Sequence, residues 1–242
     1  MGKLKQILYL TTITFSVLIK PLVQLKQKKG GLMARRKKEP QNVHRKNISS
    51  AAEQLFMEKG IENTSMNDIA KAAGYSKATI YVYFKNKEEL VSILVLKSMQ
   101  KLYQAISMTL EDTNDTKTGF ISICNSVVKY QEKYPLYFKM LLDNINIDFE
   151  NRNFLPEEKE TFLVGEAINN LLITFLEKGI KKGDLRSDIQ ILPTIFLCWG
   201  MFSGLIQLAT NKEGYILQQM GLSREEFLSN GFDAFYNSFL AI

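Results

Sequence analysis

The most regular pattern of hydrophobic and polar positions in the chain lies between residues 65 and 84. One apolar face of an α-helix, with the spacing i, i+3, i+4 and i+7, is formed by Met66, Ile69, Ala70 and Ala73. Ser65 precedes this helix as an N-cap, and Gly74 follows it with the freedom to adopt the positive φ that a tight turn needs. Ser76 is then placed to cap a second helix, so the pattern predicts two short helices joined by a turn.

The second short helix divides its side chains between a core and an outer face. Ile80 and Phe84 share one face and are expected to anchor the helix. The residues that remain mostly outward are Lys77, Ala78, Thr79, Tyr81 and Tyr83. In a helix-turn-helix protein the second helix lies in the major groove of DNA, and this set of side chains suits that position.

Two lysines occupy helix starts where the helix dipole disfavours a cation. Lys77 follows the cap residue Ser76, and Lys87 follows Asn86. A DNA phosphate at each helix start would make the lysine favourable there, because free backbone N–H groups and the lysine would both face an anion. The alternative is that both are solvated lysines with no partner. Their position on either side of a tyrosine-rich helix favours phosphate contact.

The rest of the chain predicts helices and shows no strand-like alternation of any length. Asn86-x-x-Glu89 is a capping box that opens a long helix from Lys87 to Leu110. Further helices are expected at about 117–133, 135–147, 157–181, 189–210 and 223–241, separated by proline, glycine and polar turns. The expected fold class is therefore all-α.

The segment from about Asn42 to Val91 resembles the DNA-binding domain of the TetR family of bacterial transcriptional regulators. The resemblance rests on Ile48, Ala52, Leu55, Phe56, Gly60, Thr64, Ser65, Ile69, Ala70, Gly74, Ser76, Thr79, Tyr81, Phe84, Lys87, Glu88 and Leu90. It implies base contacts from Lys77, Ala78 and Tyr81. It implies phosphate contacts from Thr64 or Ser65, and from Thr79, Tyr83 and Lys87. Val82 departs from the family, which often has an aromatic residue or histidine there.

The same resemblance implies an organisation and a mechanism for the whole chain. A basic arm would precede a three-helix DNA-binding domain at residues 42–102, with the helix-turn-helix at 65–84, and a larger helical domain at 103–242 would bind ligand and dimerise. The last two helices, about 189–210 and 223–241, would pair with their copies in a homodimer. Such a regulator is typically a cytoplasmic repressor of a palindromic DNA operator. Ligand entry would shift the helix that follows Asn86 and alter the spacing of the two DNA-binding domains.

The distribution of charge along the chain agrees with a protein that binds DNA at one end. Residues 33–101 hold 13 Lys and Arg against 7 Asp and Glu, whereas residues 102–242 hold 12 against 18. A basic amino-terminal part on an acidic body is expected when only one end of a protein meets nucleic acid.

Residues 1–32 differ from the rest of the chain. They hold six lysines and no acid, and an apolar run of 13 residues spans Ile7 to Ile19, which is too short for a membrane span. The codons for Lys28 to Met33 can read AAA AAA GGA GGT TTA ATG, which resembles a bacterial ribosome-binding site before a start codon. We therefore expect translation to start at Met33, followed by a basic arm at residues 35–38, and residues 1–32 to be an over-long gene assignment. The alternative is a real amino-terminal anchor or packed helix.

The segment from Ile191 to Ala209 supports a competing interpretation, in which the protein is attached to a membrane. Its 19 mostly apolar residues meet the length criterion for a membrane span, although Pro193, Gly200 and Gln207 weaken that interpretation. In a soluble protein, a helix that is apolar on every side is buried on two faces, here against its own domain and a second copy. The alternative function is a membrane-tethered DNA-binding regulator that uses residues 7–19 or 191–209.

Catalysis and metal binding find little support in the sequence. His44 is the single histidine, so neither a Ser-His-Asp arrangement nor a multi-histidine metal site can be assembled. Cys124 and Cys198 lie in apolar helices and are expected to be reduced core thiols. We expect no enzyme activity, no cofactor and no metal.

Aromatic residues and methionine are abundant in the carboxy-terminal part and suggest a small, largely apolar or aromatic effector. Asn169 is the polar exception on an apolar helix face, and a buried amide must find a hydrogen-bond partner in backbone, water or ligand. The candidate pocket residues are Tyr103, Phe120, Tyr137, Met140, Phe162, Asn169, Ile173 and Trp199.

Overall fold

The computed structural model describes residues 40–110, 115–143 and 155–240. This part of the chain contains ten α-helices and one π-helix, and its only β-structure is an isolated bridge between Leu185 and Leu240. The helices are α2 (Gln41–Lys59), α3 (Met66–Ala73), α4 (Lys77–Tyr83), α5 (Lys87–Leu110), α6 (Thr116–Lys133), α7 (Pro135–Asp143), α8 (Pro156–Lys182), α9 (Ile191–Asn211), α10 (Glu213–Tyr215), η1 (Ile216–Met220) and α11 (Arg224–Ser238). The all-α prediction is confirmed.

The helix bounds follow the sequence pattern closely. The long helix α5 has the predicted bounds, and α6, α8 and α9 begin and end within two residues of them. The carboxy-terminal helix α11 ends at Ser238, three residues earlier than predicted, and the backbone N–H of Arg186 then donates to the carbonyl of Phe239 at 2.9 Å. The predictions for residues 1–32, the start at Met33, the arm at 35–38 and the end of the 135–147 helix lie outside the described residues.

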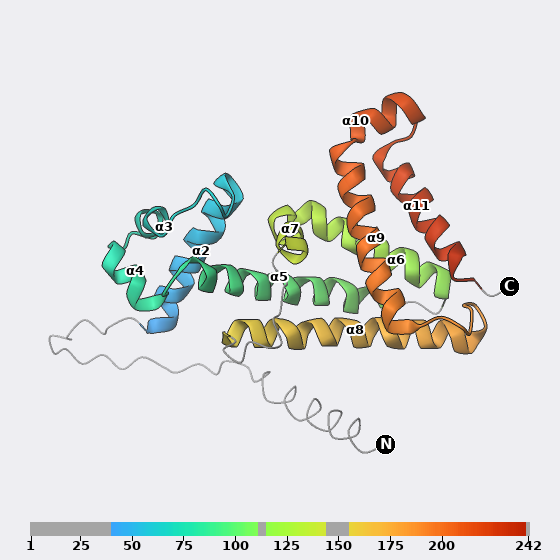
Figure 1. Ribbon diagram of the computed structural model, residues 1–242, viewed down its shortest axis with the longest axis horizontal. Helices are drawn as coiled ribbons and strands as arrows, with labels where there is room; N and C mark the ends of the chain where they lie inside the picture. The colour runs from blue at the N-terminus through green and yellow to red at the C-terminus, as the bar shows by residue number, and fades with distance from the viewer. Residues whose placement is uncertain (1–39, 111–114, 144–154, 241–242) are drawn as a thin grey trace, which may run out of the picture. The chain divides into compact units, whose positions relative to one another are not determined.

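The three helices α2, α3 and α4 pack together over one part of an apolar core that continues into the later helices (Figure 1). Its buried side chains are Ile48, Ala52, Phe56, Ile69, Ala70, Ile80 and Phe84. Ile80 and Phe84 are 0% and 1% exposed, so they anchor α4 as its sequence predicts. We call α2–α4 the head and α5–α11 the body.

The body is built on α5 and α8, which run side by side in the same direction, with α6 running back against α5 (Figure 1). The last long helices, α9 and α11, form an antiparallel pair joined through α10 and η1. Gly231 allows the close approach of this pair, because a Cβ atom there would displace the side chain of Leu205.

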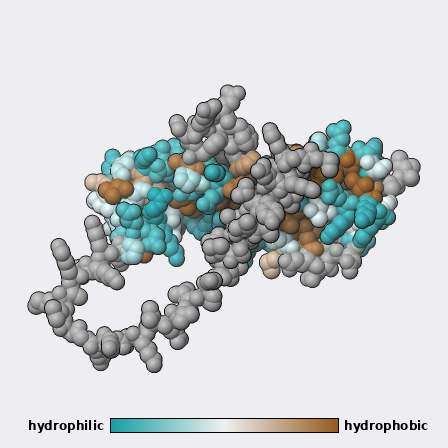
Figure 2. Space-filling model, turned by 90° about the horizontal axis from the view of Figure 1, so that it is seen from below, coloured by the Kyte–Doolittle hydropathy of each residue, from teal (hydrophilic) through white to brown (hydrophobic). Residues whose placement is uncertain are grey.

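The helix α9 buries one apolar face and exposes another. Phe202, Ile206 and Ala209 are buried, whereas Phe196 and Leu197 are 61% and 64% exposed. Figure 2 shows hydrophobic residues at the surface beside hydrophilic ones. By length and composition α9 could also cross a membrane, with a mean hydropathy of 1.7. Large apolar side chains exposed along one helix are typical of an interaction surface.

Candidate DNA-binding surface and ligand cavity

Short-range hydrogen bonds at helix starts determine the local structure of the head. The backbone N–H of Asp68 donates to Oγ of Ser65 at 3.2 Å, and the N–H of Ser65 donates to Oδ2 of Asp68 at 3.0 Å. The hydrogen bonds from Ser65 hold the pKa of the Asp68 carboxyl below its usual value. At the next helix, the N–H of Thr79 donates to Oγ of Ser76 at 3.1 Å. Gly74 adopts the predicted positive φ of 74°, so both caps and the turn are confirmed.

The outer face of α4 carries the side chains proposed for base contact. Lys77 and Ala78 are exposed, and Tyr81 is 47% exposed. Val82 is 74% exposed on the same short helix. Because this face has no covering element among the described residues, it is free to enter a groove.

Thr79 and Tyr83 are less exposed than the residues proposed for base contact. Thr79 is half-buried, with its hydroxyl 2.8 Å from Oγ of Ser76. The ring of Tyr83 lies 5.2 Å from the ring of His44. The guanidinium of Arg45 donates to the carbonyl of Tyr83 at 2.6 Å. The contacts of Tyr83 with His44 and Arg45 hold the end of α4 against α2.

Two residues proposed for phosphate contact have other partners in the structure. Thr64 is only 2% exposed, and its hydroxyl donates inward to the carbonyl of Gly60 at 2.8 Å. Thr64 is thus a structural residue here, and Ser65 is the exposed member of the pair. Lys87 begins α5 as predicted, but its ammonium donates to the carbonyl of Ile61 at 2.8 Å rather than extending into solvent. An ammonium has three donors, so Lys87 retains two for a phosphate.

The body contains an apolar cavity of about 490 Å³ between α5, α7, α8 and α9. Ligand pockets in proteins span roughly 300–1,000 Å³, so this cavity is large enough for a small effector. Its lining residues are Met99, Leu102, Phe138, Leu141, Leu142, Thr161, Phe162, Gly165, Glu166, Ile168, Asn169, Phe196, Trp199 and Ser203.

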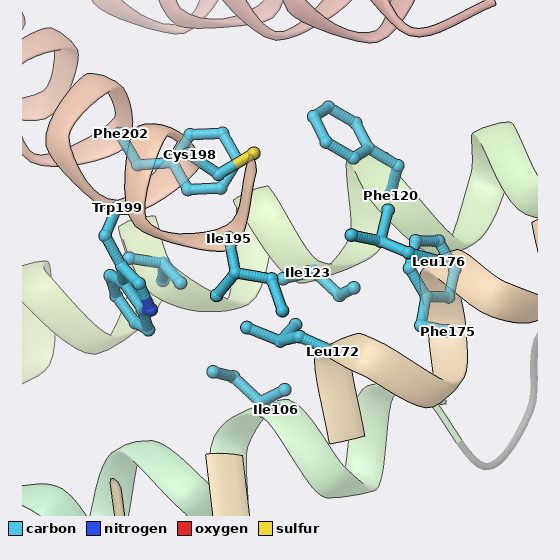
Figure 3. A pocket seen from close by; sticks show the side chains of 11 residues that line it. Ile106, Phe120, Ile123, Leu172, Phe175, Leu176, Ile195, Cys198, Trp199 and Phe202 are labelled. Atoms are coloured by element: carbon cyan, nitrogen blue, oxygen red, sulfur yellow. The ribbon is translucent and has the colours of Figure 1, made fainter. Parts of the chain in front are cut away.

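Three of the predicted pocket residues line this cavity, namely Phe162, Asn169 and Trp199. Phe120 and Trp199 line a second, smaller cavity of about 40 Å³ with entirely apolar walls from α5, α6, α8 and α9. In Figure 3, Trp199 and Cys198 project from α9 on one side of this space, with Phe120, Leu172 and Leu176 on the others. A space of that size is too small for an effector of the kind proposed.

The other four predicted pocket residues, Tyr103, Tyr137, Met140 and Ile173, line neither cavity. In α7 the cavity face consists of Phe138, Leu141 and Leu142, which recur at i, i+3 and i+4. Tyr137 and Met140 lie one position earlier, about 100° around the helix, and are 3% and 0% exposed in the core. Because α7 is apolar on both faces, its sequence alone does not distinguish the residues that line the cavity from those in the core.

The polar groups of the cavity centre on Asn169 and Glu166. Asn169 is half-buried rather than buried, and its Nδ2 donates to Oε1 of Glu166 at 3.1 Å. Glu166 also lines the cavity, although it is not among the pocket residues that the sequence predicts. The hydroxyls of Thr161 and Ser203 donate to carbonyls one turn earlier, Glu157 at 2.8 Å and Trp199 at 2.6 Å.

Two helices that line the cavity also contact α2 of the head. In α7, the hydroxyl of Tyr137 donates to Oε1 of Glu53, whose Oε2 accepts from Nζ of Lys97 at 2.7 Å. Burial and the neighbouring Glu53 carboxylate raise the pKa of Tyr137 well above its usual value. In α8, Glu157 accepts from Arg45 at 3.4 Å. Arg45 also lies over the ring of Phe84, 4.3 Å from its centroid, so it connects α8 to the end of α4.

The two cysteines are free thiols, as predicted. Burial raises the pKa of Cys198 to about 11 and that of Cys124 further above its usual value. Both thiols therefore stay protonated at neutral pH and are poor nucleophiles. Within the described ranges, no group of three or more His, Cys, Asp or Glu side chains is arranged to hold a metal ion.

The head and its exposed α4 define a DNA-binding protein of the helix-turn-helix class. Comparison with known proteins gives the same result. Residues 48–93 match the model of bacterial regulatory proteins of the tetR family.

Relatives of known structure or function extend this match beyond the head. The fatty acid metabolism regulator protein of Bacillus subtilis is 25% identical over 192 residues, covering 76% of this chain and 93% of that protein. The regulator TtgR of Pseudomonas putida is 36% identical over 83 residues, covering 34% of this chain and 39% of that protein. A crystal structure of FadR from Bacillus subtilis in complex with stearoyl-CoA shares the fold with a TM-score of 0.59 at 15% identity, over 81% of this chain and 99% of that one.

The chain belongs to the TetR family of DNA-binding transcriptional regulators. It is thus a regulator and not an enzyme, as its sequence indicates. Regulators of this family bind DNA and effector ligands.

Proposed function

We propose that this chain is a cytoplasmic repressor that binds a palindromic operator as a homodimer and is released from it by a ligand in the 490 Å³ cavity. The observation that carries the proposal is the pair of contacts between cavity-lining helices and α2. Phe138 lines the cavity, and the adjacent Tyr137 donates to Glu53 of the head. A ligand that displaces α7 therefore acts on a residue that holds the head.

The proposed DNA contacts follow from the exposure of the head's side chains. Base contact is assigned to Lys77, Ala78 and Tyr81, which lie exposed on α4. Phosphate contact is assigned to the remaining polar residues at the edges of the surface, which are Ser65, Thr79, Tyr83 and Lys87. In this division the phosphate contacts position the helix, and the base contacts supply sequence preference.

The proposed domain division is 42–102 for DNA binding and 103–242 for ligand binding and dimerisation. The helix α5 is continuous across residue 102, and it also lines the cavity through Met99 and Leu102. A displacement of α5 would therefore affect both the DNA-binding part and the ligand-binding part. Such a switch requires the ligand to bind the DNA-incompetent state better, typically by about 1–3 kcal/mol.

The proposed dimer interface is the exposed apolar face of α9 together with α11. Leu192, Phe196, Leu197 and Leu208 are each 47–64% exposed on α9, which is unusual for large apolar residues of one helix. A second copy of α9 and α11 would cover them. The alternative cover is a membrane, which would make the protein a tethered regulator.

The experiment that tests this function starts with selection of operator DNA from a random duplex pool by the purified full chain. We expect an inverted repeat and two chains per bound duplex, measured by light scattering. Leu197→Glu should weaken dimerisation by about 2 kcal/mol or more and reduce binding to the repeat accordingly. Leu163→Glu is the matched control, because Leu163 is 57% exposed on α8 and outside the proposed interface.

The outcomes separate the proposal from its alternative. A single half-site bound by one chain, or equal effects of the two glutamates, would contradict the homodimer. Flotation of the full chain with neutral lipid vesicles would favour the membrane-tethered alternative. A positive reporter gene response to the chain, with transcription raised at the operator, would contradict repression.

A further inference from the structure

The polar residues that line the 490 Å³ cavity differ in charge. Of its fourteen lining residues, ten are apolar and four are polar, namely Thr161, Glu166, Asn169 and Ser203. Glu166 is the one charged residue among the described residues that line the cavity, and it is an acid. An anionic ligand group placed here would meet this carboxylate and no cation from the described lining residues.

The hydrogen bonds of these four residues leave mostly acceptors for a ligand. Thr161 and Ser203 use their hydroxyl hydrogens on carbonyls of their own helices, so only oxygen lone pairs remain. Asn169 uses one N–H on Glu166, which leaves its Oδ1, its second N–H and the rest of the Glu166 carboxylate. The lining donors that remain are that second N–H of Asn169 and the indole N–H of Trp199.

The polar pair also lies at the cavity mouth. Glu166 is exposed although it lines the cavity, as are Leu142 and Phe196. The rest of the wall includes the aromatic rings of Phe138, Phe162 and Trp199. A ligand would therefore place its apolar part among the aromatic rings and its polar group beside Glu166 and Asn169. Aromatic faces attract cations as well as apolar groups.

We infer that the ligand of this cavity is an apolar cation, such as a hydrophobic amine. This inference rests on the proposed function, because it names the class of molecule that would release the operator. The ammonium group would donate to the Glu166 carboxylate and to Oδ1 of Asn169, and the hydrocarbon would fill the space between α5, α7, α8 and α9. The ligand class differs from the anionic stearoyl-CoA bound by the structurally similar FadR.

The test uses four probes with one hydrocarbon chain and different polar groups: decylammonium, decanol, decanoate and decanoyl-CoA. Trp199 is the single tryptophan of the chain and lines the cavity, so its fluorescence reports binding directly. We expect decylammonium to bind at least about fivefold more tightly than decanoate, because the carboxylate at the partly exposed mouth attracts one and repels the other.

Glu166→Gln in the full chain keeps the shape of the side chain and removes its charge. It should abolish most of the preference for decylammonium while leaving the affinity for decanol unchanged. Glu177→Gln is the matched control, because Glu177 is also an exposed acid of α8 but does not line the cavity. That variant should retain the preference of the unaltered chain.

Three results would overturn the inference: tighter binding of decanoate or decanoyl-CoA, equal binding of the probes in the presence of Glu166, or no fluorescence response to any probe. An operator-release assay with the same probes tests the proposed function separately. Release by decanoyl-CoA would overturn the ligand class but support ligand-released repression. Binding of decylammonium without any release would support the ligand class and count against the proposed function.

Discussion

The head and the body carry out their roles through different kinds of structure. In the head, the residues proposed for base contact are exposed on α4, and the short helices α3 and α4 are set by caps that span three residues. In the body, the cavity is formed by four helices whose lining residues are up to about a hundred positions apart in sequence, from Met99 to Ser203. Function in the head is thus local and outward, whereas function in the body depends on long-range packing.

This difference has a consequence for regulation. We expect the locally determined head to move as a unit and the cavity to change shape with its contents. The contacts Tyr137 to Glu53 and Arg45 to Glu157 join the two regions. The following predictions test whether head and body are separable in the way that this comparison implies.

The largest effect is expected from removal of the apolar anchor of α4. Phe84→Ala should cost about 3–5 kcal/mol of stability, because Phe84 is 1% exposed and its loss leaves a cavity under the end of the helix. Chemical denaturation measures the change. Val82→Ala is the control at an exposed position two residues earlier and should be nearly neutral. Comparable midpoints for the two variants would show that α4 is not anchored as described.

A smaller effect distinguishes sequence reading from positioning within the head. Lys77→Ala should weaken binding by about 1–3 kcal/mol at its contacted base and relax preference there. Lys87→Ala should weaken binding to all sequences alike and lower the salt slope by about one unit. Anisotropy titrations on single-base operator variants at several salt concentrations measure both. Equal effects of the two substitutions on every sequence would refute the division.

Because Lys87 also donates to the carbonyl of Ile61, its removal needs a control. Lys87→Gln can retain a hydrogen bond to that carbonyl while losing the charge. If the salt slope falls equally in Lys87→Gln and Lys87→Ala, the lost interaction is with phosphate. A normal salt slope with reduced stability would assign Lys87 to the fold alone.

Helix caps provide a matched pair between the two regions. Ser76→Ala and Ser223→Ala each remove an N-cap that accepts from a backbone N–H at 3.1 Å, one in the head and one at the start of α11. Each should cost about 0.5–2 kcal/mol of stability. Only Ser76→Ala should also weaken operator binding per folded dimer. Loss of operator affinity in Ser223→Ala at concentrations where the dimer is intact would contradict the separation.

The smallest effect on stability is expected at the cavity. Asn169→Leu should change the free energy of unfolding by within about 0.5 kcal/mol, because the side chain is half-buried and its amide donates to the exposed Glu166. It should leave operator affinity nearly intact and raise the decylammonium concentration needed for release by about threefold to tenfold. A thermal melt beside an operator-release titration measures both. A destabilised protein with an unaltered release curve would remove Asn169 from the ligand site.

The head could be predicted from sequence in detail because its structure depends on neighbouring residues. Ser65, Gly74 and Ser76 define the two caps and the turn, and the core positions Ile80 and Phe84 follow from helix periodicity. Two residues depart from the prediction, one through a local contact and the other through a contact across the fold. Thr64 turns inward to Gly60, and Lys87 reaches Ile61, which is 26 positions earlier.

The cavity could be predicted only in part, since helix periodicity does not say which apolar face meets which neighbour. In α7, both faces are apolar, and the packing of α5 and α8 decides that Phe138 rather than Tyr137 faces the cavity. Glu166 has the spacing of a solvated residue and is exposed, yet its hydrogen bond to Asn169 brings it to the cavity mouth. Glu166 lies three positions before Asn169 on the same helix, so the two side chains are neighbours on its surface. A polar residue at that spacing from a predicted pocket residue is the signal that would have identified Glu166.

The measurement that tests the central claim most directly is a pair of titrations on Tyr137→Phe and the unaltered chain. The claim is that the cavity acts on the head through the bond from Tyr137 to Glu53. Decylammonium binding is followed by Trp199 fluorescence, and operator affinity is measured with and without saturating ligand. We expect unchanged ligand binding and a fall of at least about fivefold in the ratio of the two operator affinities, because the ring remains and only the coupling bond is lost. An unchanged ratio in a folded Tyr137→Phe dimer would contradict the claim.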